Sequence, residues 1–329
     1  MIATEEGVFV ARQGSKWLVE EHLKDKSPES LSIDPTDPGL VYCGTEGAGV
    51  WRSENAGRTW APVGVDVLPV TVTAVAVSAG EAGVVYAGTE PSAIFRSDDG
   101  GDTWGELSGL RALPSSQSWS FPPRPETHHV RWIEPDPVVP GRVFVAIEAG
   151  AFVRTADGGR TWLDRVRGGP LDTHTAATHK MAPGKVYAAA GDGYFESGDA
   201  GESWSRPVEG LQHRYVVGVA VDPGDPSAVI VSAASGPFVA YGPRRAEAYV
   251  YRRTGRRAFE LAMEGLPDAQ GTVASRFATD RHEPGVIYAT NNHGIFRTAD
   301  AGQTWTALEI PWPPHAFSRG VDALVCLPD

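Results

Sequence analysis

Short apolar segments separated by polar turns run along the whole chain. Five of them, Gly49–Arg52, Ala93–Arg96, Ala151–Arg154, Gly193–Glu196 and Gly294–Arg297, alternate between apolar and polar positions before a polar turn begins. A period of two residues is typical of β-strands that have one buried face. The pattern therefore predicts an all-β chain built from many short strands.

Each of these five segments is followed by the same eight-residue phrase. Its fullest copy is Ser97-Asp98-Asp99-Gly100-Gly101-Asp102-Thr103-Trp104, and the other copies occupy 53–60, 155–162, 197–204 and 298–305. The third residue is Asp or Asn, which accepts hydrogen bonds from backbone N–H groups in turns, and the glycine in the fifth position tolerates positive φ. The final tryptophan offers a large apolar surface to the next strand. We predict a β-hairpin turn at each copy, with a structural rather than catalytic carboxylate.

A second phrase, rich in Asp and Pro, joins two apolar strands elsewhere in each unit, as at Asp34–Tyr42, Asp136–Phe144 and Asp222–Ile230. The two phrases together define a unit of four strands, whose third strand begins at residues 7, 49, 93, 151, 193, 249 and 294. Repeats of about 40 to 50 residues with four strands each are typical of β-propeller blades. The eight-residue phrase is degenerate in the first and sixth units.

We therefore predict a single domain over residues 1–329, an all-β, seven-bladed β-propeller with four-stranded antiparallel blades. The chain begins on the second strand of a unit, and Val321–Cys326 reads as the first strand of one. The ring is expected to close when this C-terminal inner strand joins the N-terminal strands, which removes open sheet edges.

The eight-residue phrase resembles the Asp-box, or BNR, repeat of sialidases, xyloglucanase-type glycosyl hydrolases, sortilin-like receptors and photosystem II assembly-factor propellers. This resemblance covers nearly the whole chain and implies the propeller architecture, with ligands bound on the face opposite the repeated turns. Sialidases offer a further analogy through their arginine cluster and tyrosine, although this chain has seven units and lacks their N-terminal Arg-Ile-Pro phrase. Xyloglucanase-type enzymes place the substrate between two propellers, and a single propeller lacks that cleft.

Bulk composition narrows the set of partners. The 329 residues carry a net charge of −12, which argues against nucleic acid or an anionic membrane surface as a partner. The N-terminus lacks the basic start and apolar run of a signal peptide, so we expect a cytoplasmic protein. Cys43 and Cys326 are too few for a disulfide framework. We also expect a monomer.

Side chains used in chemistry gather in the connections between one unit and the next. The candidates there are His128, His129, Arg131, His174, His213, Arg214, Tyr215, Arg276 and Arg319. In an acidic protein, a mouth rich in histidine and arginine predicts a site for an anionic or carbohydrate-like small molecule at the central channel. We expect His174, His213 and Tyr215 to exchange protons and the others to bind ligand. Alternatively, these side chains simply pair with nearby carboxylates.

Such carboxylates occur in the turns between second and third strands on the same face, at Glu46, Glu90 and Glu148. Two of them facing a sugar would provide an acid and a base or nucleophile, although duplicated units also inherit equivalent surface residues. Insertions at about 105–127 and 234–248 are expected on this face. In the first of them, Trp119 would stack on a sugar ring, or else pack onto the propeller.

No short metal-binding motif is present, and we expect no cofactor. If the connections converge near the axis, they would bring together four histidines able to hold a divalent metal: His128, His129, His174 and His213.

Two classes of function remain open. One is a glycosyl hydrolase or polysaccharide lyase acting on a bound glycan. The other is a noncatalytic assembly propeller that holds a protein segment.

Overall fold

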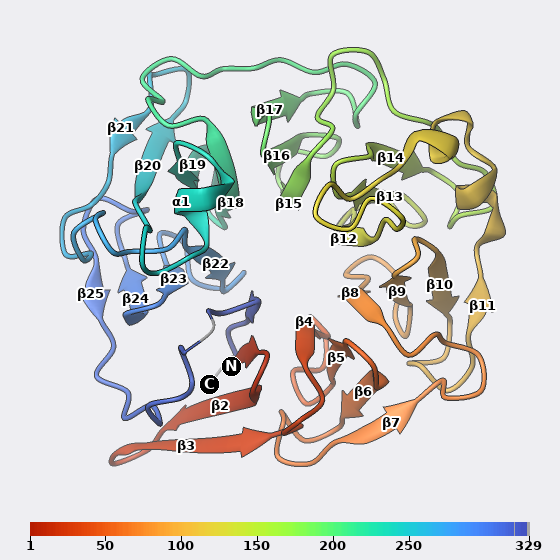
Figure 1. The fold of residues 1–329 in the computed structure, drawn as a ribbon, viewed down its shortest axis with the longest axis horizontal. Helices are drawn as coiled ribbons and strands as arrows, with labels where there is room; N and C mark the ends of the chain where they lie inside the picture. Colours follow the sequence, from red (N-terminus) through yellow and green to blue (C-terminus); the bar gives the residue numbers. More distant parts are fainter. Residues whose placement is uncertain (319, 328–329) are drawn as a thin grey trace.

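The structure is a computed structural model that describes residues 1–318 and 320–327. Seven antiparallel sheets stand around a central axis, and the colours in Figure 1 pass once around the ring. Each sheet places its first strand nearest the axis and its last strand on the outside. The predicted seven-bladed β-propeller is therefore confirmed.

The first three blades contain these strands: β26 (Ala323–Leu324), β1 (Ile2–Thr4), β2 (Gly7–Gln13) and β3 (Trp17–His22); then β4 (Pro28–Ile33), β5 (Val41–Thr45), β6 (Gly49–Ser53) and β7 (Ala61–Val63); then β8 (Val72–Val77), β9 (Val85–Thr89), β10 (Ile94–Ser97) and β11 (Gly105–Glu106).

Blades four and five contain three named strands each, β12 (Val130–Pro135), β13 (Val143–Ile147) and β14 (Ala151–Thr155), then β15 (Thr173–Thr178), β16 (Val186–Ala190) and β17 (Gly193–Ser197). In both, a single bridge supplies the fourth position, from Arg154 to Leu163 and from Glu196 to Ser205. The last two blades contain β18 (Tyr215–Asp222), β19 (Asp225–Ala234), β20 (Ala248–Thr254) and β21 (Glu260–Leu261), then β22 (Arg276–Thr279), β23 (Ile287–Asn291), β24 (Gly294–Thr298) and β25 (Thr306–Ala307).

The ring closes between the two ends of the chain. Strand β26 pairs antiparallel with β1, so that Ile2 lies opposite Leu324 and Ala3 opposite Ala323. The N-terminal amine donates a hydrogen bond of 2.9 Å to the carbonyl oxygen of Val325. This closure confirms the prediction that the C-terminal inner strand joins the N-terminal strands.

The repeated eight-residue turns use their side chains as the sequence suggested. In blade three, Asp99 accepts hydrogen bonds from the backbone N–H (2.8 Å) and the hydroxyl (2.6 Å) of Thr103. The Trp104 indole donates to the carbonyl of Gly101 at 2.9 Å and is buried. The hydroxyl hydrogen bond from Thr103 lowers the pKa of Asp99 to about 2. These carboxylates therefore stabilise their turns as anions.

The hydrophobic core lies between neighbouring blades. The core shared by blades three and four includes Tyr86, Ile94, Val145 and Val153, all nearly inaccessible to solvent. Adjacent sheets approach so closely that a Cβ at Gly88 would lie 2.4 Å from a methyl carbon of Val130. A larger residue at that position would push the two blades apart.

The two insertions form short helical segments. The first contains the 3₁₀ helices η1 (Ser108–Ala112) and η2 (Pro114–Ser118), and the second contains α1 (Pro237–Ala240). In Figure 1, α1 lies over β18 and β19. Among the described residues, no helix combines the length and the apolar composition that crossing a membrane requires.

Candidate functional site

A central cavity of about 460 Å³ follows the axis of the ring, and residues of the innermost strand of every blade line it. We call one end of the cavity the mouth. At this end the innermost strands begin, close to the turns that join the second and third strands of the blades. There the backbone N–H groups of Glu46, Glu148 and Gly191 donate to the carbonyls of Ser27, His129 and Asp172. The unit-to-unit connections therefore share one face with these turns.

Irregularities at the heads of the innermost strands decide which side chains enter the mouth. The pairing register shifts at the second residue of β4, β8, β12, β15 and near the head of β18, at Glu29, Thr73, Arg131, His174 and Val217. Bulges of this kind re-aim a side chain, and they recur next to functional sites. All of these residues except Val217 line the cavity, as do two residues at the heads of the other inner strands, Arg276 and Asp322.

His174 is the most buried polar side chain of the mouth, at 1% exposure. Its Nδ1 atom lies 2.7 Å from the carbonyl of Val216, so Nδ1 carries the proton and donates. Nε2 then accepts a hydrogen bond of 3.2 Å from the hydroxyl of Tyr215. Burial lowers the pKa of His174 to about 4, which keeps the imidazole neutral. Tyr241, from the second insertion, packs edge-on against this ring and is 41% exposed.

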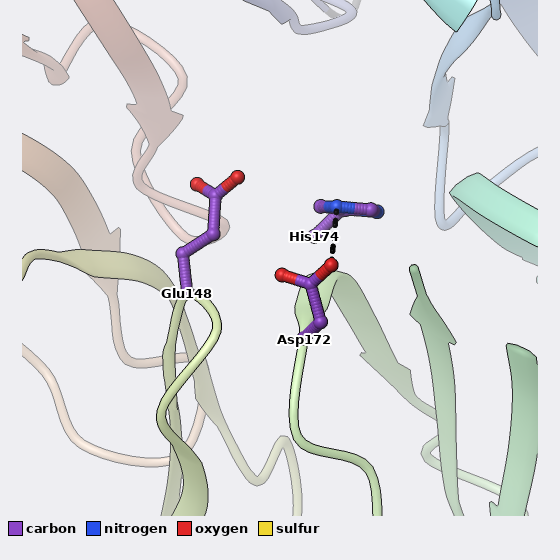
Figure 2. Close-up of side chains that lie close together, drawn as sticks. All are labelled: Glu148, Asp172 and His174. Atoms are coloured by element: carbon purple, nitrogen blue, oxygen red, sulfur yellow. Dashed lines mark ion pairs between the residues drawn. The ribbon is translucent and has the colours of Figure 1, made fainter. Parts of the chain in front are cut away.

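Two carboxylates stand beside His174, as Figure 2 shows. Glu148 comes from the turn between β13 and β14, and Asp172 directly precedes β15. One ligand atom from each of Glu148, Asp172 and His174 lies within 4.8 Å of the other two. Asp172 Oδ2 is 3.8 Å from His174 Nε2, and its Oδ1 accepts from the backbone N–H of Ala149 at 3.1 Å.

The environments of the two carboxylates separate their pKa values. Burial and the neighbouring charge of Glu148 raise the pKa of Asp172 to about 6. Glu148 is also buried, but a 2.7 Å hydrogen bond from His129 and the charge of Arg131 lower its pKa to about 2. Between these values Glu148 is ionised and Asp172 holds a proton.

Two arginines and two further acids complete the mouth. Arg131 Nε lies 3.4 Å from Glu148 Oε2, yet it makes no hydrogen bond within the described part of the chain. Burial and the nearby charge of Arg131 lower the pKa of Arg276. Burial and the neighbouring Asp322 raise the pKa of Glu29 to about 7. The mouth thus combines guanidinium donors with carboxyl groups that take up protons near neutral pH.

The predicted residues divide between this mouth and other surroundings. His129, Arg131, Glu148, His174, Tyr215 and Arg276 gather around the mouth. Glu90 and Glu46 both face Arg124, at 2.6 Å and 3.8 Å, and Glu90 also lies 3.6 Å from His129 Nδ1. The pairing of His129 and Arg131 with Glu148 agrees with the alternative that these cations pair with nearby carboxylates.

The other candidates lie apart from the mouth. His213 stacks on Tyr249 with 4.0 Å between ring centroids, and its Nδ1 lies 2.6 Å from the hydroxyl of the buried Tyr251. Arg214 is exposed to solvent. His128 accepts a 3.3 Å hydrogen bond from the N–H of Ser92. Arg319 lies outside the described residues.

Trp119 does not present a free ring face. It is 5% exposed, belongs to the core between blades three and four, and donates its indole proton to Ser115. The expected stacking of Trp119 on a sugar would require it to leave that core, so packing onto the propeller is the arrangement observed.

The four histidines that converging connections would allow to hold a metal are not brought together, because His213 stacks elsewhere and His128 accepts a hydrogen bond from Ser92. Among the described residues, Glu148, Asp172 and His174 are the group whose ligand atoms are close enough to share an ion. Both carboxylates and the Nε2 lone pair suit a divalent cation. However, the imidazole of His129 and the guanidinium of Arg131 already contact the Glu148 carboxylate.

Four residues of the mouth were absent from the candidate set derived from sequence: Asp172, Tyr241, Glu29 and Asp322. Asp172 stands two residues before His174, and Glu29 occupies in β4 the position that Arg131 occupies in β12. Aligning the heads of the inner strands would have found Glu29. Tyr241 gave no such signal, because only the path of the insertion brings it to His174.

The fold and the site define a seven-bladed β-propeller with a polar channel mouth of arginine, carboxyl and histidine side chains. The chain is similar in structure to a GH74 enzyme from Niastella koreensis, with a TM-score of 0.71 and 16% identity over 92% of this chain and 51% of that one. A GH74 xyloglucanase from Xanthomonas campestris gives a TM-score of 0.68 and 17% identity over 93% and 52%. YCF48 bound to a D1 peptide gives a TM-score of 0.60 and 16% identity over 93% and 88%.

The chain spans 39% to 52% of the length of the GH74 chains it matches. At these identities the likeness shows the fold alone. No family model matches the sequence, and no curated protein sequence matches it.

Proposed function

We propose that the channel mouth binds a carbohydrate and that Asp172 and Glu148 hydrolyse one of its glycosidic bonds. The observation that carries this proposal is a pair of adjacent carboxyl groups whose pKa values differ, about 6 for Asp172 and about 2 for Glu148. Glycoside hydrolysis needs one protonated and one ionised carboxyl group at the scissile bond.

Each carboxyl group has a role that follows from its surroundings. Asp172 would protonate the leaving oxygen as the general acid, because its raised pKa keeps it protonated in mildly acid solution. Glu148, held as an anion by His129 and Arg131, would act as the nucleophile. Carboxyl groups about 5 Å apart are typical of retaining enzymes, whereas inverting enzymes need more than about 6.5 Å. One oxygen of each carboxyl group lies within 4.8 Å of one oxygen of the other, and this close approach supports the shorter, retaining arrangement, which the stereochemistry of the product tests.

The rest of the mouth would bind and orient the sugar. Arg276 has no ion pair with any described residue, and it lines the cavity together with Arg131. Their guanidinium groups can donate to sugar hydroxyls or to the carboxylate of an acidic sugar. The exposed Tyr241 ring offers an apolar face at the entrance. His174 and Tyr215 would pack beside Asp172, whose position is fixed by the hydrogen bond from the N–H of Ala149. The similarity in fold to GH74 enzymes supports this proposal.

The test is turnover of a panel of neutral and acidic oligosaccharides, followed as release of reducing ends. We expect hydrolysis by the unaltered protein and a loss of about a thousandfold or more in Asp172→Asn and Glu148→Gln. Glu202→Gln is the matched control, because Glu202 is exposed and lies in a repeated turn on the opposite face of the ring. The anomer formed first, observed by NMR, tests retention. A folded protein that hydrolyses no member of the panel, or an Asp172→Asn variant with full activity, would refute the proposal.

A noncatalytic function in holding a protein segment is the second candidate. It is supported by the similarity to YCF48, which matches this chain over 88% of its own length and whose structure contains a D1 peptide. Recovery of an intact protein partner, lost in Arg276→Ala but kept in Glu202→Gln, together with no glycan turnover, would favour this candidate over the hydrolase.

A further inference from the structure

The sixth blade departs from the repeat at the turn between β20 and β21. There the chain reads Thr254-Gly255-Arg256-Arg257-Ala258-Phe259, without the acid or the final tryptophan of the other copies. Arg252 pairs with Glu260, eight residues further on, whereas Arg96 of blade three pairs with Gly105, nine residues further on. The turn of blade six is therefore one residue shorter, and it carries arginines.

Arg253 occupies a strand position that a hydroxyl residue holds elsewhere. It lies opposite Val229, as Ser197 of blade five lies opposite Val186. Both side chains are buried, but Ser197 caps its own turn by accepting from the N–H of Gly201 at 2.8 Å, and an arginine cannot accept a hydrogen bond. The substitution therefore replaces a local cap with a buried positive charge.

The charge of Arg253 is only partly compensated. The side chain is 6% exposed and forms an ion pair with Glu196 of β17, in the preceding blade. Its guanidinium also lies over the rings of Phe259 (5.1 Å) and Tyr194 (5.6 Å). Arg253 Nε has no hydrogen-bond partner among residues 1–318 and 320–327. Glu196 divides its own charge, because it also lies 3.8 Å from Lys185 Nζ and accepts from the Tyr194 hydroxyl.

A groove of about 720 Å³ opens at this point between blades five and six. Its cations are Lys185, Arg253, Arg256 and Arg257, and its acids are Glu196 and Glu209. Arg206 also lines it, but that guanidinium bonds the carbonyl of Asp192 and stacks on Phe195. Arg256 and Arg257 are exposed, and their guanidinium groups contact no acid of the described chain. In a protein of net charge −12, this groove concentrates unpaired positive charge.

The groove is remote from the channel mouth. The N–H of Gly255 donates to the carbonyl of Ser227, which lies near the start of β19, just after the turn between β18 and β19. That turn lies at the other end of the inner strand from the bulge near Val217 that faces the mouth side. A ligand in the groove would therefore not compete with a ligand in the mouth.

We propose that this groove is a second binding site, for a small molecule that carries tetrahedral oxyanions, namely phosphate or sulfate groups. Arginine presents a planar fork of N–H donors that matches such oxyanions, and two exposed arginines flank a third whose Nε is unpaired. A ligand with two anionic groups would bridge Arg256 and Arg257 at the rim to Arg253 and Lys185 inside.

The experiment is calorimetric titration of the full chain with inorganic pyrophosphate at low salt. We expect one molecule bound per chain and a loss of about tenfold or more in affinity for R256A/R257A, whose changes are exposed and spare the core. The control R58A/R160A removes two arginines from regular turns on the same face, so it lowers the overall charge equally. Its affinity should stay within about twofold of the unaltered protein.

Competition identifies the group that is recognised. Sulfate should displace pyrophosphate from the unaltered protein, whereas acetate at the same ionic strength should not. Absence of pyrophosphate binding, equal weakening in the two double variants, or displacement by acetate as effective as by sulfate would each overturn the proposal.

Discussion

Replacing Asp172 with asparagine should stabilise the protein at neutral pH while removing its proposed activity. Burial and the charge of Glu148 raise the pKa of Asp172 from 3.8 to about 6. The folded protein thus binds a proton more tightly than the unfolded chain does. Stability then falls as pH rises from about 4 to above 6, and the full loss remains at higher pH.

The magnitude follows from the size of this pKa difference. Raising the pKa from 3.8 to about 6 corresponds to about 3 kcal/mol of destabilisation of the ionised carboxylate. Because 30% of the side chain is exposed to solvent, we expect Asp172→Asn to raise the free energy of unfolding by about 1 to 3 kcal/mol at about pH 7.5. The amide oxygen can still accept from the N–H of Ala149, so the turn is retained.

Urea denaturation followed by tryptophan fluorescence, at about pH 3.5 and about pH 7.5, measures this difference. Asp157→Asn is the control of opposite sign. The hydroxyl hydrogen bond of Thr161 lowers the pKa of Asp157 to about 2, so its ionised form is stabilising and its loss should destabilise at neutral pH. Asn55 fills the same turn position in blade two and accepts from the N–H of Thr59, which shows that an amide fits there.

The reasoning fails if Asp172→Asn destabilises the protein at about pH 7.5, or if its effect is the same at both pH values. Either result would show that Asp172 is not a strained carboxylate beside Glu148 in the folded state.

The remaining predictions address the mouth and the ring. Glycan hydrolysis should fall about tenfold per pH unit above about pH 6 as Asp172 loses its proton, and kcat/KM that stays flat to about pH 8 would contradict this role. Gly191→Ala would place a Cβ 2.0 Å from Asp172 Oδ2, so turnover should drop with little change in Tm; full activity would show that Asp172 can move away freely. Deleting residues 321–327 removes β26 and should lower the Tm by more than about 10 °C in calorimetry, and an unchanged Tm would rule out a stabilising closure. Hydrolysis should survive dialysis against EDTA because His129 and Arg131 hold Glu148, whereas loss reversed by Zn²⁺ would assign Glu148, Asp172 and His174 to a metal.

Some residues predicted from the sequence lie at the mouth and others lie elsewhere, and this difference has a physical explanation. His174 and His213 both lie near the start of an inner strand, so the sequence pattern does not distinguish them. In the structure, the bulge at the head of β15 turns His174 into the cavity. His213 precedes β18 and stacks on Tyr249 of the same blade instead. The difference arises from the path of a connection, which has no periodic pattern to read.

The repeated turns and the alternation of apolar residues determined the blade, the number of blades and the closure between Ile2 and Leu324, because these features depend on short-range backbone chemistry that recurs in every unit. Only the tertiary structure decided which side chains meet. Glu148 and Asp172 come from different blades, and Tyr241 reaches them from an insertion. Their distances and pKa values depend on how neighbouring sheets pack around the axis, and no local stretch of sequence encodes that packing.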